Sequence, residues 1–89
     1  MEPVIVPIED VIDLHTFHPR DIPSLIEDYV AECVRAGFAT VRIIHGKGTG
    51  RLRQVIREAL RNSAYVSSYE EGGEKEGGEG VTIAHLSED

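Results

Sequence analysis

The chain has 89 residues, of which 40% are hydrophobic, and a formal net charge of −7 at pH 7. This length accommodates one domain with a modest core and leaves no room for a second core. No apolar run approaches the roughly 18 residues of a membrane-spanning helix, and the first ten residues carry acids where a signal peptide has Lys or Arg. We therefore expect one domain over residues 1–89, cytoplasmic and without a membrane segment.

The charges are distributed unevenly along the chain. Residues 1–34 contain one basic and eight acidic side chains, residues 35–61 contain seven basic and one acidic, and residues 62–89 contain one basic and seven acidic. A positive middle between acidic ends can create a local anion-attracting surface in a protein of negative net charge. A solvated helix face is the alternative explanation of the same arginines.

The first half of the chain predicts a strand, a helix and a second strand. Residues 11–15 are rich in branched side chains, which favours a strand. Asp21 and Pro23 are typical of a helix start, and Gly37 of a helix end. Residues 38–44 predict the second strand. The apolar stripe of the helix consists of Ile22, Leu25, Ile26, Tyr29, Val30, Cys33 and Val34, so the single cysteine is expected to be a buried thiol.

The second half predicts a helix followed by two strands. Helical spacing of apolar residues runs from Gly50 to the Asn-Ser pair at 62–63, and residues 65–69 alternate as a strand does. Residues 70–80 are acidic and glycine-rich, which predicts a mobile loop. Residues 81–86 predict the last strand, so the predicted core extends over residues 11–86.

The order β-α-β-α-β-β predicts a two-layer α/β sandwich with a mixed four-stranded sheet. A strand–helix–strand unit crosses over right-handedly and pairs its strands in parallel. The carboxyl ends of the first two strands therefore share one edge of the sheet, which brings Asp13 and His15 toward His45. Ligands of open α/β sheets bind at this edge, and the second helix begins there with unpaired backbone N–H groups.

The turn between the second strand and the second helix has the character of a phosphate cradle. Gly46, Gly48 and Gly50 let the backbone approach an anion closely, and Lys47 and Arg51 add positive charge. The third glycine comes too early for the dinucleotide-binding fingerprint, and the four-residue spacer of a P-loop is missing. A nucleotide cofactor is therefore disfavoured.

Three segments together resemble the Smr (small MutS-related) domain, in its stand-alone bacterial form: IDLHTFHPRD, VRIIHGKGTGRLR and GGEGVTIAHL. The resemblance covers about residues 11–86. It implies an α/β sandwich like the C-terminal domain of the third translation initiation factor. It also implies nucleic-acid binding and, in several members, DNA-nicking or RNA-cleaving endonuclease activity, with a link to MutS2-like DNA repair and recombination or to RNA quality control.

The family's motifs map onto numbered positions of this chain. Its Asp-x-His motif, linked to cleavage, falls on Asp13 and His15, and Thr16 stands where a glycine is usual. Its His-Gly-x-Gly motif falls on residues 45–48. Its late glycine motif falls on residues 77–80, where Glu79 replaces the usual tryptophan. An aromatic platform contributes about 1–3 kcal/mol of stacking per base, and a carboxylate repels phosphate, so this loop is expected to bind less well.

Phosphodiester hydrolysis needs a base, a proton donor and positive charge near the phosphate. His15 and His45 belong to the residue type that titrates near neutral pH, and Asp13 could orient an imidazole or hold a cation. The expected catalytic residues are thus Asp13, His15 and His45. The expected nucleic-acid-binding residues are Arg20, Gly46, Lys47, Gly48, Thr49, Gly50, Arg51, Gly78 and Gly80.

The choice of nucleophile leaves the cofactor open. In RNA the adjacent 2′-hydroxyl could attack without a metal, whereas in DNA a water is needed and a divalent cation, Mg²⁺ or Mn²⁺, on Asp13 becomes plausible. No zinc site is predicted, because His15, His18 and His45 lack cysteine partners and a recognised spacing.

Two other functions fit the same residues. The cradle could bind nucleic acid without cutting it, which Glu79 and the acidic loop favour, or the acidic first helix could recruit a protein partner. Asp13 could also merely cap a turn, and His15 and His45 could be satisfied polar residues. The sequence indicates neither a monomer nor a dimer.

Overall fold

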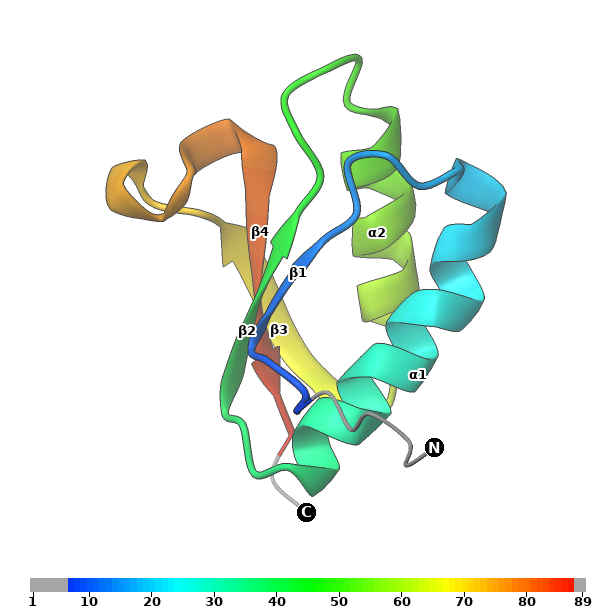
Figure 1. The fold of residues 1–89 in the computed structure, drawn as a ribbon, viewed down its shortest axis with the longest axis vertical. Helices are drawn as coiled ribbons and strands as arrows, with labels where there is room; N and C mark the ends of the chain where they lie inside the picture. Colours follow the sequence, from blue (N-terminus) through cyan, green and yellow to red (C-terminus); the bar gives the residue numbers. More distant parts are fainter. Residues whose placement is uncertain (1–6, 88–89) are drawn as a thin grey trace, which may run out of the picture.

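Residues 7–87 are described in the computed structural model, and they form a mixed four-stranded sheet with two helices on one face (Figure 1). In chain order the helices and strands are β1 (Val11–Asp13), α1 (Ile22–Arg35), β2 (Thr40–Ile44), α2 (Arg51–Asn62), β3 (Val66–Glu71) and β4 (Val81–Leu86). The predicted two-layer α/β sandwich is confirmed. Within residues 7–87, no helix combines the length and the apolar composition needed to cross a membrane.

The strand order β1-β2-β4-β3 places the two parallel strands at one side of the sheet. β1 pairs in parallel with β2, with Asp13 opposite Ile44, whereas β4 runs antiparallel to both β2 and β3. The parallel β1–α1–β2 unit brings the carboxyl ends of β1 and β2 to the same edge, as the element order predicts. The segment after β1 and the turn after β2 therefore meet at that edge.

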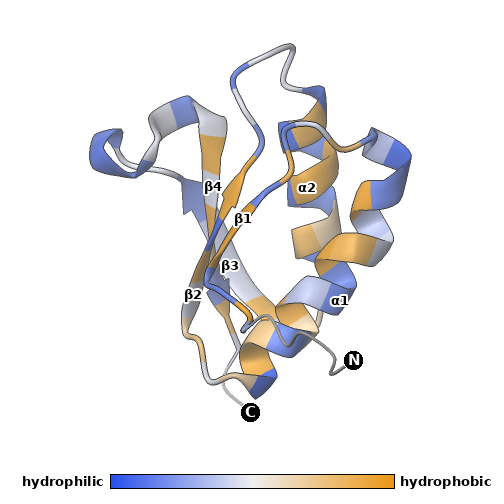
Figure 2. Ribbon diagram, in the orientation of Figure 1, coloured by the Kyte–Doolittle hydropathy of each residue, from blue (hydrophilic) through white to orange (hydrophobic). Residues whose placement is uncertain are grey.

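The core lies between the sheet and the two helices (Figure 2). On β2, Val41 and Ile43 alternate with more exposed residues and face the helices, and their partners on β4 are Ala84 and Thr82. The helices contribute Ile22, Ile26, Val30, Cys33, Ile56 and Leu60, all completely buried. Thr82 is a completely buried polar residue at the end of this apolar layer, so its hydroxyl needs partners inside the protein.

Several predicted boundaries are wrong by a few residues. β1 ends at Asp13 and leaves His15 outside the strand, because the chain turns there and the N–H of Phe17 bonds to the carbonyl of Leu14. β2 begins at Thr40 and not at Phe38. Phe38 still belongs to the end of α1, because its N–H donates to the carbonyl of Cys33.

The predicted loop over residues 70–80 begins too early. Glu70 and Glu71 belong to β3, where they pair with Ile83 and Thr82 of β4. The remainder forms two short 3₁₀ turns, Glu74–Glu76 and Gly78–Gly80. Composition alone missed this order, because backbone pairing with β4 overrides the low strand preference of acidic residues.

Candidate active site and nucleic-acid interface

Asp13 and His15 form a hydrogen-bonded pair at the end of β1. Oδ1 of Asp13 accepts the backbone N–H of His15 at 3.0 Å and lies 2.6 Å from its ring Nδ1. The backbone bond, followed by the ring bond, lowers the pKa of Asp13 below its ordinary value. The carboxylate therefore only accepts, so Nδ1 of His15 carries a proton, and Nε2 is the ring nitrogen left to exchange a proton with a substrate. Both side chains are about half exposed, at 48% for Asp13 and 57% for His15.

The glycine turn, residues 46–50, approaches His15 closely. Gly46 and Gly50 have φ angles of +81° and +84°, a left-handed conformation that L residues with side chains rarely adopt. A Cβ atom on Gly46 would lie 3.7 Å from Cβ of His15. The start of the turn is fixed to the 3₁₀ turn Gly78–Gly80 just before β4, because the carbonyl of Gly80 accepts the N–H groups of His45 and Gly46 at 2.9 and 3.0 Å.

Between His15 and this turn lies a cavity of about 270 Å³, here called the turn cavity. It is lined by His15, His45, Gly46, Gly48, Thr49, Gly50, Arg51, Leu52 and Arg53. The first intrahelical bond of α2 runs from Gln54 to the carbonyl of Gly50 at 3.0 Å, and the N–H of Arg51 donates to Oγ1 of Thr49 at 3.4 Å. The backbone N–H groups of Leu52 and Arg53, two of the lining residues, have no partner in the described part of the chain. Unpaired N–H groups and the positive helix end favour an anion such as phosphate.

His45 also lines the turn cavity, but its ring is held inside the protein. His45 is only 4% exposed. Its Nδ1 lies 2.9 Å from the carbonyl of Gly46, and its Nε2 lies 2.9 Å from Oγ1 of Thr82. A carbonyl only accepts, so Nδ1 carries the proton and Nε2 accepts the threonine O–H. Burial, and then the nearby Arg57 and Arg53, lower the pKa of His45 despite the opposing Gly46 carbonyl. His45 thus lies at the predicted edge of the sheet, but its ring is buried and both of its nitrogens are engaged.

The other expected binding residues divide into two groups. Gly46, Gly48, Thr49, Gly50 and Arg51 line the turn cavity. Gly80 lies directly beneath the turn, since a Cβ atom on it would be 3.5 Å from Gly46 and from the Lys47 side chain.

Besides Gly80, three expected binding residues do not line the turn cavity. Lys47 is exposed and instead lines a shallow depression shared with Lys75 and Gly80. Gly78 lies in the second 3₁₀ turn, where its N–H bonds to the carbonyl of Gly73. Arg20 is exposed in the 3₁₀ turn before α1, and its backbone N–H donates to Nδ1 of His18. Among the described residues, no hydrogen bond or ion pair joins these three residues to the Asp13–His15 pair.

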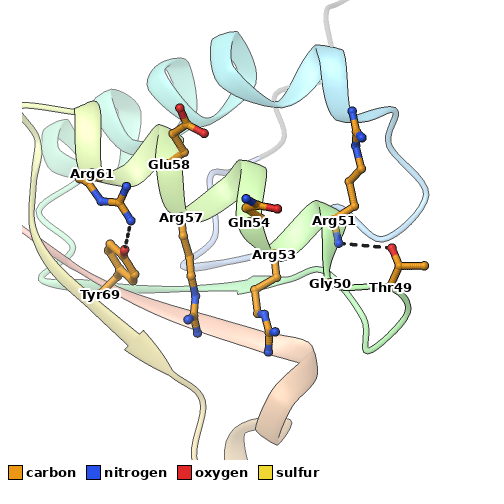
Figure 3. Close-up of a pocket in the computed structure, with 9 residues that line it drawn as sticks. All are labelled: Thr49, Gly50, Arg51, Arg53, Gln54, Arg57, Glu58, Arg61 and Tyr69. Atoms are coloured by element: carbon orange, nitrogen blue, oxygen red, sulfur yellow. Dashed lines mark hydrogen bonds between the residues drawn. The ribbon is translucent and has the colours of Figure 1, made fainter.

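Sequence reasoning missed a second recessed surface, here called the arginine groove. This groove of about 570 Å³ runs along α2 and is lined by Thr49, Gly50, Arg51, Arg53, Gln54, Arg57, Glu58, Arg61 and Tyr69 (Figure 3). The four-residue spacing of Arg53, Arg57 and Arg61 was the only sequence signal for this groove. It did not identify the groove, because exposed arginines on a helix are equally well explained by their contribution to solubility. The contribution of Tyr69 from β3 could not be read from α2 alone.

Within residues 7–87, no group of three or more His, Cys, Asp or Glu side chains is arranged to hold a metal ion. Of the expected site residues, Asp13 alone offers a carboxylate, and its Oδ1 already accepts two hydrogen bonds from His15. A divalent cation at Asp13 would therefore take most of its ligands from water and substrate, a coordination that Mg²⁺ tolerates well.

Comparison with known proteins identifies the family of this chain. The model of the Smr domain family matches residues 12–87. Endonuclease MutS2 of Symbiobacterium thermophilum is 46% identical over 77 residues, which cover 86% of this chain and 10% of that protein. Endonuclease MutS2 of Thermomicrobium roseum is 43% identical over 79 residues, with 89% and 10% covered. The chain thus spans about a tenth of the length of these relatives.

Two solved structures share the fold. The Smr domain of Thermus thermophilus MutS2 superposes with a TM-score of 0.81 at 39% identity, covering 86% of this chain and 96% of that one. YdaL, a stand-alone small MutS-related protein from Escherichia coli, superposes with a TM-score of 0.83 at 20% identity, covering 92% and 67%. The second likeness concerns the fold alone.

Proposed function

The chain belongs to the Smr domain family, and from this premise we propose that it binds nucleic acid and cleaves phosphodiester bonds. The observation that carries the proposal is the Asp13–His15 pair, which leaves Nε2 of an oriented imidazole beside a cavity lined by unpaired backbone N–H groups. A base next to an anion-binding cavity is the minimum arrangement for attack on a bound phosphate. The relatives named Endonuclease MutS2 support the same activity class.

On RNA, the proposed step uses the substrate's own nucleophile. The 2′-oxygen attacks the adjacent phosphorus, Nε2 of His15 takes the 2′-hydroxyl proton, and the bond from phosphorus to the 5′-oxygen breaks. The leaving 5′-oxygen takes a proton from water, and the products are a 2′,3′-cyclic phosphate and a 5′-hydroxyl. Asp13 stabilises the imidazolium through its 2.6 Å contact with Nδ1, and the N–H groups at the start of α2 stabilise the phosphate charge.

On DNA, the proposed step needs a water molecule as nucleophile. His15 would take a proton from that water, and a divalent cation such as Mg²⁺ or Mn²⁺, held in part by Asp13, would lower the pKa of the water and stabilise the leaving oxygen when bound. RNA and DNA thus differ in the expected effect of a chelator.

His45 has a different role in this proposal from the one its sequence position suggests. Both of its ring nitrogens are engaged by Gly46 and Thr82, and its lowered pKa favours the neutral ring. Such a ring is a poor proton donor to a leaving group. We assign it to positioning of the glycine turn, with water as the donor.

Binding without cleavage is the second candidate, and Glu79 favours it. This carboxylate is exposed on the 3₁₀ turn that ends at Gly80, directly beneath the glycine turn. A negative charge there opposes phosphate approach, where the family usually has an aromatic residue.

As a location we propose the cytoplasm, which the buried free thiol of Cys33 supports.

One experiment separates the two candidates and the two polymers. Supercoiled plasmid and a labelled single-stranded RNA are incubated with the wild type and with Asp13→Ala, each with and without a chelator. The proposal predicts cleavage by the wild type, loss of cleavage in the variant, and chelator sensitivity confined to DNA. Binding of either polymer without any cleavage would establish the second candidate instead.

A further inference from the structure

The arginine groove adjoins the turn cavity and is lined by all four arginines of α2. Arg53 and Arg57 extend from the same side of α2 toward β4, and Arg61 lies beside Tyr69 (Figure 3). Successive positions at four-residue intervals lie on one helix face, and like charges at this spacing repel one another. The acidic groups nearby are Glu58 on the groove wall and Glu71, whose carboxylate is 4.0 Å from Arg53. A bound polyanion would relieve the repulsion.

Arg57 is held in place at the floor of this groove. Its Nε donates to Oγ1 of Thr82 at 3.5 Å, and its guanidinium lies over the Tyr69 ring, 5.6 Å from the ring centre. Its Nη2 is buried and has no hydrogen-bond partner in the part of the chain that the structure describes. A buried donor without an acceptor is costly, and a phosphate oxygen in the groove would supply one once the guanidinium turns toward it.

Tyr69 fixes the far end of the groove. Its hydroxyl oxygen accepts a hydrogen bond from Nη2 of Arg61 at 3.0 Å, while Arg57 covers its ring. Two of the three arginines are therefore oriented by one aromatic side chain of β3. Cations that are already oriented lose less side-chain entropy when they bind a ligand.

The groove continues into the turn cavity, since Thr49, Gly50, Arg51 and Arg53 line both. From Arg51 to Arg61, α2 advances about 15 Å along its axis, so the two surfaces form one path several nucleotides long. A phosphate at His15 would have the neighbouring phosphates of its strand directed along α2.

We propose that the arginine groove binds the sugar–phosphate backbone of a single nucleic-acid strand that flanks the phosphodiester held in the turn cavity. The half-buried position of Arg53 and Arg57 favours a single strand, because a strand free of a pairing partner can enter the recess. The position of the cleaved phosphate rests on the proposed function, whereas the binding of the strand does not.

The test measures binding in the cleavage-deficient Asp13→Ala background, by fluorescence anisotropy with labelled single-stranded oligonucleotides and matched duplexes. Arg57→Gln and Arg61→Gln each remove one groove cation. Arg35→Gln removes one cation from the end of α1, where it pairs with Glu32 and does not line the groove, and is the charge-matched control.

We expect about tenfold weaker binding of single strands for each groove variant and a salt slope reduced by about 0.7 per arginine, with Arg35→Gln unchanged. Thermal unfolding of each variant verifies that it is folded, and Arg57→Lys, which retains the charge, should recover part of the affinity. Equal affinities for the groove variants and Arg35→Gln would overturn the proposal, as would tighter binding of duplex than of single strands.

The two proposals fail separately. If the wild type binds single strands through the groove but cleaves neither RNA nor DNA, the groove stands and the endonuclease proposal fails. If the wild type cleaves but the groove variants bind and cleave as Arg35→Gln does, the groove assignment fails alone.

Discussion

Oδ1 of Asp13 lies 2.6 Å from Nδ1 of His15 and also accepts that residue's backbone N–H at 3.0 Å. One carboxylate oxygen therefore orients both the backbone and the ring of a residue two positions along the chain. This is a local contact, so the Asp-x-His motif alone encodes the orientation of the imidazole. The cavity that would hold a phosphate next to the imidazole depends on the rest of the fold.

Asp13→Asn should lower the cleavage rate by about 100-fold while leaving substrate affinity nearly unchanged. The amide is the same size as the carboxylate but does not stabilise the imidazolium that forms when His15 takes a proton. Single-turnover cleavage and anisotropy on the same labelled oligonucleotide measure the two quantities. Asp10→Asn is the isosteric control on an exposed carboxylate outside the turn cavity. An equal loss in both variants would contradict the assigned role.

Thr82→Val should destabilise the protein by about 1–3 kcal/mol, even though the two side chains have similar shapes. The substitution leaves Nε2 of His45 without its donor and Nε of Arg57 without its acceptor, and both lie in a buried setting. Urea unfolding measures the change. Thr40→Val, at an exposed position of β2, is the matched control and should change stability by less than about 0.5 kcal/mol.

Stability should fall with decreasing pH in part because of His45. Its pKa is lowered in the folded protein, so between that value and the ordinary 6.5 the unfolded chain binds a proton that the folded chain does not. The free energy of unfolding therefore rises with pH across this window and levels off above it. Urea unfolding at several pH values should give a shallower dependence in His45→Gln than in the wild type.

Gly46→Ala should cost about 1–2 kcal/mol of stability and reduce cleavage. The φ angle of +81° is strained for alanine, and the new methyl group would lie 3.7 Å from Cβ of His15. Gly48→Ala is the internal control, because its added Cβ would meet no atom within 4 Å and its φ lies outside the left-handed region. Equal effects of the two substitutions on stability would show that the turn tolerates a side chain at Gly46.

The elements that the sequence predicts well are those whose side-chain pattern faces one core. The apolar stripe of α1 and the branched residues of β2 identify their elements, and all six elements appear in the predicted order. The boundary of the acidic loop is wrong because the pairing of Glu70 and Glu71 with β4 depends on the sheet.

The candidate site was predictable only where its contacts are local. The Asp13–His15 pair spans two residues, and the parallel crossover brings it to the glycine turn. The burial of His45 depends on Thr82, 37 residues away, and the groove depends on Tyr69, which meets Arg57 and Arg61 through the packing of β3 against α2. No periodicity within one segment carries these contacts. From the sequence of α2 alone, its arginines therefore cannot be distinguished from those of an ordinary solvent-exposed helix face.

The most direct measurement of the central claim compares His15→Ala with the wild type on one labelled single-stranded RNA. We expect the same dissociation constant for both proteins, because the groove and the α2 N–H groups are retained, and a cleavage rate about 100-fold or more lower in the variant. Equal cleavage rates, or an equal loss of binding and cleavage, would contradict the assignment of His15 as the base.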